Sequence, residues 1–125
     1  MTPYSVEWTI AWAIALVITL AAETPVYAWL LGRPRRRGVL VGVTASLITH
    51  PVLWFVVSPW LWVRHLWTTS TWIAVEVVIT LVEGVWVTLW YRRTLRLRDA
   101  VVIAAAANLA SIVVGEIIRP WVPYL

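Results

Sequence analysis

Residues 17–23 read VITLAAE, and residues 78–83 read VITLVE. Each of these two stretches is apolar, ends in a glutamate and is followed by a cluster of arginines. A charged side chain at the centre of a membrane-spanning helix costs about 2.5–3.5 kcal/mol on insertion scales, so such residues are rare and mark functional sites. Glu23 and Glu83 are therefore the first candidates for a functional role.

The composition around these stretches is typical of an integral membrane protein. Hydrophobic residues make up 62% of the 125 residues and charged residues 13%, whereas soluble domains carry about 25% charged residues. The chain has no cysteine, which excludes disulfides and thiolate metal sites and leaves imidazole, carboxylate, amide and hydroxyl groups as metal ligands. We expect a single transmembrane domain over residues 1–125.

Four apolar segments are long enough to cross a bilayer, which takes about 20 residues. They lie near 7–31, 39–62, 71–91 and 100–118. Because the breaks between them are short, consecutive helices are expected to pack as antiparallel neighbours. The predicted fold is therefore all-α, a polytopic bundle of four transmembrane helices.

The basic residues predict the orientation of these helices. All ten are arginines, and eight of them fall in two clusters, at 33–37 and 92–98. Arginine-rich loops face the cytoplasm, so we expect a multi-pass protein of the cell (inner) membrane with both clusters inside and both termini outside. Topology and contact with lipid headgroups explain the positive charge, and a basic folded surface for nucleic acid is not indicated.

The eleven tryptophans gather toward the expected helix ends, mostly at the outer side. A tryptophan ring is apolar while its N–H group needs a hydrogen-bond partner, so this residue prefers the membrane interface. An aromatic belt is therefore the expected role, and an aromatic cage around a cation is the alternative.

The two halves of the chain, about 7–62 and 71–118, share more than the opening stretches. Each half is a helix with a buried glutamate, an arginine loop, and a helix with two polar residues three positions apart. These pairs are Ser46 with Thr49 and Asn108 with Ser111. Because each half crosses the membrane twice, both halves start from the same side. The pattern predicts a parallel 2+2 internal repeat about an axis along the membrane normal.

One polar residue on each helix lies at a similar expected depth, given a rise of about 1.5 Å per residue. These residues are Glu23, His50, Glu83 and Asn108. Glu76 lies on the helix face of Glu83, nearer the outer surface. Since lipid disfavours polar groups, these faces are expected to turn inward and to form a binding site for an ion or small solute.

Other polar side chains share the helix faces of this layer and are expected to support it: Thr19, Tyr27, Ser46, Thr49, Thr80 and Ser111. Pro25 and Pro51 lie close to Glu23 and His50. A proline inside a helix removes one hydrogen bond and frees the carbonyl four residues earlier. We expect kinks at both prolines, with freed carbonyls able to bind a cation or water.

Three functions fit this pattern. The first is an ion- or proton-coupled transporter of a small solute or ion, because carboxyl and imidazole groups can carry protons; a chain this small is expected to form a homo-oligomer. The second is an intramembrane enzyme or cofactor site with a divalent metal on Glu23, His50 and Glu83, although the Glu-x-x-His pairs of di-iron bundles are missing. The third is a structural or assembly subunit of a membrane complex. No pattern of catalytic residues is readable.

Overall fold

The computed structural model describes residues 2–122, and this range is helical without any strand. Four helical spans are long and apolar enough to cross a membrane, which confirms the predicted number of transmembrane segments. The first span is α1 (Val6–Leu30), the third is α4 (Thr69–Trp90), and the fourth is α5 (Leu97–Ile118) with the 3-10 turn η2 (Arg119–Trp121).

The second span is continuous but not uniform. It consists of α2 (Arg35–Val52), the π-helical segment η1 (Leu53–Val57) and α3 (Ser58–Val63). The sequence predicted a kink at Pro51, and η1 begins two residues after this proline. Segments of π-helix inside a longer helix often accompany functional sites. Pro25, by contrast, lies within α1 without ending it.

The helices begin earlier at the arginine-rich end than the hydropathy pattern predicted. α2 begins at Arg35 rather than near 39, and α5 begins at Leu97 rather than near 100. Arginine is a good helix former, and its charged head reaches water from the end of a helix. The hydropathy pattern therefore marks the apolar part of each helix and not its full length.

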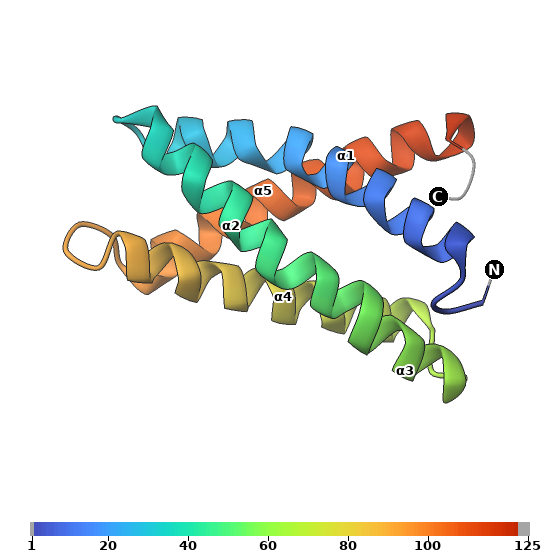
Figure 1. Ribbon diagram of the computed structural model, residues 1–125. Helices are drawn as coiled ribbons and strands as arrows, with labels where there is room; N and C mark the ends of the chain where they lie inside the picture. Colours follow the sequence, from blue (N-terminus) through green and yellow to red (C-terminus); the bar gives the residue numbers. More distant parts are fainter. Residues whose placement is uncertain (1, 123–125) are drawn as a thin grey trace.

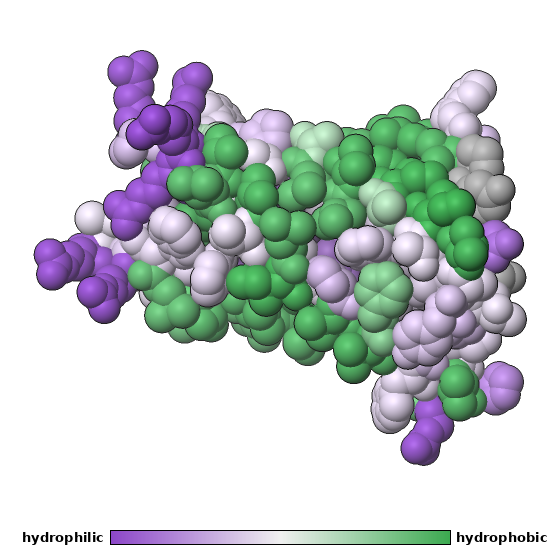
Figure 2. Space-filling model, viewed as in Figure 1, coloured by the Kyte–Doolittle hydropathy of each residue, from purple (hydrophilic) through white to green (hydrophobic). Residues whose placement is uncertain are grey.

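Both arginine-rich connections lie at one end of the molecule (Figure 1). The start of α1, the end of α5 and the turn between α3 and α4 lie at the other end. α1 packs against α2 and α5, and α4 packs against α5, whereas the contact between α2 and α4 is smaller. Hydrophilic surface is concentrated at the two ends, with a hydrophobic middle between them (Figure 2).

Glycines allow the helices to approach closely. A Cβ atom on Gly42 would lie 2.8 Å from the Tyr27 ring, and one on Gly84 would lie 2.5 Å from Cγ2 of Val101. Small residues at such positions are typical of helix contacts in membranes. The α1–α2 and α4–α5 pairs therefore depend on these two glycines.

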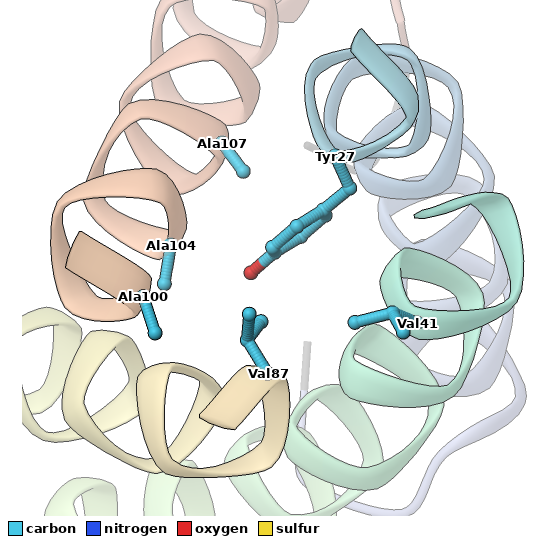
Figure 3. Close-up of a cluster of buried hydrophobic side chains, with 6 residues drawn as sticks. All are labelled: Tyr27, Val41, Val87, Ala100, Ala104 and Ala107. Carbon is cyan, nitrogen blue, oxygen red and sulfur yellow. The ribbon is translucent and has the colours of Figure 1, made fainter. Parts of the chain in front are cut away.

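A compact apolar cluster fills the bundle on the arginine side of the two buried glutamates. It consists of Tyr27, Val41, Val87, Ala100, Ala104 and Ala107, here called the Tyr27 cluster. The Tyr27 ring extends from α1 into the space between the other helices (Figure 3). All six residues are essentially inaccessible to solvent, so this end of the bundle is closed.

Candidate functional site

Glu23 is buried in the middle of the bundle and is held by two serines. Its carboxylate, on α1, is 1% exposed. The Ser46 hydroxyl of α2 donates to Oε2 over 2.8 Å, and the Ser111 hydroxyl of α5 donates to Oε1 over 2.8 Å. Both carboxylate oxygens therefore have a hydrogen-bond donor from a neighbouring helix.

Glu83, on α4, is equally buried and has one donor more. Its Oε2 accepts from the Tyr27 hydroxyl at 2.9 Å and from the Asn108 amide at 2.8 Å. Its Oε1 accepts from the Thr49 hydroxyl at 2.8 Å. Three helices thus contribute donors to this one carboxylate.

The donors connect the two carboxylates into one network. Ser46 and Thr49 lie three residues apart on α2, and Asn108 and Ser111 lie three residues apart on α5. Three residues correspond to a rise of about 4.5 Å. Within each pair, one residue donates to Glu23 and the other to Glu83. The network therefore links both carboxylates and ties all four spans together.

Neither carboxylate has a cationic partner in the part of the chain that the structure describes. The ion pairs found there join Arg98 to Asp99 and Arg119 to Glu116, and all four of these side chains are well exposed. Moving an ion from water into a low-dielectric interior still costs several kcal/mol after relaxation, so buried charges normally have a counter-charge. The protein itself supplies only neutral donors here.

A cavity of about 410 Å³ leads to this network from the end that lacks the arginine clusters. Glu23, Glu83 and Asn108 lie at its inner end, and Trp62 and Trp67 are among the residues that line it near the surface. No member of the Tyr27 cluster lines the cavity. The site is therefore open toward one end of the bundle and closed toward the arginine clusters.

His50 lines the cavity but does not donate a hydrogen bond to either carboxylate. Its Nε2 lies 3.4 Å from the Thr19 hydroxyl, and its ring stacks on Trp54 with 6.1 Å between the centroids. Its Nδ1 is buried and has no hydrogen-bond partner among residues 2–122. Thr49, one position earlier, is the residue of α2 that reaches Glu83.

The remaining predicted site residues divide in two groups. Glu76 is half-buried and lines the cavity between its mouth and Glu83, which agrees with its expected position. Thr80 is half-buried, does not line the cavity and is not among the donors to either carboxylate. The structure thus brings Glu23, Glu83, Asn108, Ser46, Thr49, Ser111 and Tyr27 together, with Glu76, His50 and Thr19 along the wall.

The divalent-metal hypothesis lacks a ligand cluster. Within residues 2–122, no three histidine or acidic side chains are grouped so that they could hold a metal ion. Glu23 and Glu83 accept from different residues of α2 and α5, and His50 faces Thr19 and Trp54 instead. Glu23, His50 and Glu83 are therefore not arranged as a set of ligands for one metal ion.

Sequence reasoning missed the second role of the tryptophans. Five of them line the cavity: Trp8, Trp54, Trp62, Trp67 and Trp72. The sequence predicted an interfacial belt for these residues, and that prediction does not include the lining of a cavity. The available signal was the excess of tryptophan at one membrane side only.

No known protein family, curated protein or solved structure matches this chain, so its function is inferred from the geometry described above.

Proposed function

We propose that this protein is a carrier of the cell membrane that moves a small cation, or a solute coupled to protons, with Glu23 and Glu83 as the binding site. The observation that carries this proposal is a pair of buried carboxylates at the inner end of an open cavity. Because the described part of the chain offers them no cation, a proton or a bound cation must balance their charge.

The proposed topology places the arginine clusters in the cytoplasm and the cavity mouth outside. Positive loops stay on the cytoplasmic side during insertion, and both clusters lie at the same end of the molecule (Figure 1). Four antiparallel helices would then enclose a site that is open to the outside and closed by the Tyr27 cluster toward the cytoplasm. A carrier in its outward-facing state has this form.

The hydrogen bonds support the proposed parallel repeat. Under that repeat, Glu23 corresponds to Glu83, and the pair Ser46 and Thr49 corresponds to Asn108 and Ser111. Each glutamate accepts from the first polar residue of its own half and from the second polar residue of the other half. Two related halves facing each other across a central axis would produce this exchange.

The test is transport by the purified protein in liposomes, with the carboxylates neutralised one at a time. Glu23→Gln and Glu83→Gln keep the donors satisfied. The amide oxygen of the new side chain at position 83 can still accept from Tyr27 and Asn108, and Ser46, Ser111 and Thr49 each also contact a backbone carbonyl of their own helix. Glu7→Gln is the matched control, since Glu7 is exposed and does not line the cavity.

Liposomes loaded with a pH-sensitive dye would receive inward gradients of Na⁺, K⁺ or benzyltrimethylammonium in turn. The wild type and Glu7→Gln are expected to show cation-driven proton flux. In Glu23→Gln and Glu83→Gln the rate of this flux is expected to fall at least about tenfold, because a neutral amide cannot balance the charge of a cation. Flux that is absent for every cation, or equal in all variants, would refute the carrier. Lower thermal stability as the sole effect would instead indicate the structural subunit.

A further inference from the structure

We infer that the ligand of this cavity is an organic ammonium ion, with a cationic head that binds at Glu23 and Glu83 and an apolar body that lies among the tryptophans. The inference rests on the proposed function and names its substrate class. It depends on three features of the cavity: its size, the character of its wall and the distribution of charge along it.

The size of the cavity fits an organic molecule. Its volume of about 410 Å³ lies within the range of roughly 300–1,000 Å³ that is typical of sites for drug-sized ligands. A bare metal ion or a proton needs far less space. The cavity is also continuous from the carboxylates to the surface, so a ligand several atoms long could occupy it with its charge at the inner end.

The wall between the mouth and the carboxylates is mostly apolar and aromatic. Leu53, Ile79 and Ile112 line it together with the five tryptophans already named. Trp8 and Trp54 are fixed in place, because Trp8 Nε1 donates to the Trp54 carbonyl over 3.2 Å and the rings pack edge to face at 5.3 Å. Thr19, Ser58, Glu76 and Glu116 also line this wall and supply oxygen atoms, but alkyl or aryl groups would be buried favourably against its apolar part.

The charge along the cavity is negative only. The lining contains Glu23, Glu76 and Glu83, together with Glu116, which is paired with Arg119 just outside the lining, but no arginine. A cleft with charges of one sign and apolar walls concentrates ions of the opposite sign. Tryptophan faces attract cations as well, and quaternary ammonium groups are commonly bound in this way. Carboxylates at the inner end and aromatic rings along the wall therefore select for a cation with an apolar body.

The experiment is equilibrium dialysis of the full-length protein in mild detergent with radiolabelled benzyltrimethylammonium. Two competitors separate the parts of this probe: Na⁺ carries the charge without the apolar body, and benzyl alcohol carries the ring without the charge. We expect saturable binding that neither competitor displaces at concentrations where unlabelled probe does. Displacement by Na⁺ at equal concentration would overturn the inference.

Trp72 provides the test of the aromatic wall, because it is half-buried and lines the cavity. Trp72→Leu is expected to weaken binding about 3- to 30-fold, and Trp72→Phe less, since a phenyl face retains part of the attraction. Trp29→Leu is the matched control: Trp29 is 74% exposed and lies on α1 outside the cavity lining. Equal binding by Trp72→Leu and the wild type would overturn the inference.

The two proposals can fail separately. Glutamate-dependent flux of Na⁺, K⁺ or protons without any binding of the probe would leave the carrier intact and reject the organic ammonium ligand. Probe binding that depends on Trp72 and Glu23 without flux in liposomes would support the ligand and reject transport.

Discussion

At the scale of single residues, the two buried carboxylates differ in the kind of donor that holds them. A hydroxyl carries one hydrogen, and both serines at Glu23 have a second acceptor within reach. Ser46 lies 3.1 Å from the Gly42 carbonyl, and Ser111 lies 2.9 Å from the Asn108 carbonyl. Both can therefore turn away from Glu23 and remain hydrogen-bonded.

Glu83 has no such freedom at its Oε2 atom. The Asn108 amide already uses its second hydrogen on the Ala104 carbonyl, and the Tyr27 hydroxyl donates only to Glu83 within the described chain. If Glu83 were lost, both of these buried donors would lack a partner. Glu83 therefore matters more for folding than Glu23 does.

Replacement of each glutamate by leucine tests this difference. Glu83→Leu leaves two buried donors unsatisfied, at about 1–3 kcal/mol each, whereas Glu23→Leu leaves none. We expect Glu83→Leu to unfold at a clearly lower temperature than Glu23→Leu in the same detergent, measured by circular dichroism. Equal midpoints for the two variants would contradict this account of the network.

Much of this group of polar residues could be singled out from the sequence. The cost of exposing Glu23, Glu83 or Asn108 to lipid leaves few directions in which their side chains can point. The sequence could not show whether Thr49 or His50 is the residue of α2 that contacts Glu83. These neighbours differ by about 100° around the helix, and the rotation of α2 against α1 and α4 determines which of them reaches Glu83.

At the scale of the helices, close packing depends on single glycines. Gly84 on α4 faces Val101 on α5, and an added Cβ would lie 2.9 Å from the Val101 Cα. Backbone atoms cannot move aside as a flexible side chain can. The α4–α5 contact would therefore have to widen to accept any larger residue.

Gly84→Ala and Gly115→Ala form a matched pair, because both positions are inside helices. Alanine favours a helix by up to about 1 kcal/mol over glycine, and Gly115 has open space around it. We expect Gly115→Ala to keep or raise the thermal midpoint. Gly84→Ala is expected to lower the midpoint, because overpacking reduces the free energy of unfolding by about 1–3 kcal/mol. A stabilising Gly84→Ala would show that the helices are not packed as described.

Hydropathy predicted the four spans because the length of an apolar run is a direct requirement of the bilayer. It gave no sign of the π-helical segment η1 or of the starting residues of α2 and α5. The π-helical turn over Leu53–Val57 has no hydrophobic period of its own in the sequence.

At the scale of the whole molecule, the important property is that the bundle is open at one end and closed at the other. The cavity reaches Glu23 and Glu83 from the tryptophan-rich end, while the Tyr27 cluster fills the interior on the arginine side. The hydropathy of the helices could not show this, because it does not indicate how closely the helices pack at either end. At the closed end, three alanines of α5 are buried in the Tyr27 cluster.

The lack of native cysteine allows this asymmetry to be mapped with single cysteines and a membrane-impermeant maleimide. In right-side-out vesicles we expect labelling of Ser70→Cys at the outer turn and of Gly115→Cys in the cavity. Thr94→Cys should react only in inverted vesicles, and Ala104→Cys, in the Tyr27 cluster, in neither. Labelling of Gly115→Cys from the inverted side alone would reverse the proposed orientation of the cavity.

Tyr27 contributes both to the closed end and to the network, since its ring belongs to the cluster and its hydroxyl donates to Glu83. A cation that takes this oxygen of Glu83 competes directly with Tyr27. Ligand affinity and closure toward the arginine clusters would then share one coupling free energy, and coupling of this kind is reciprocal. In inverted vesicles, benzyltrimethylammonium should therefore raise the reactivity of Ala104→Cys toward the maleimide. An unchanged reactivity would show that ligand binding and closure of the bundle are independent.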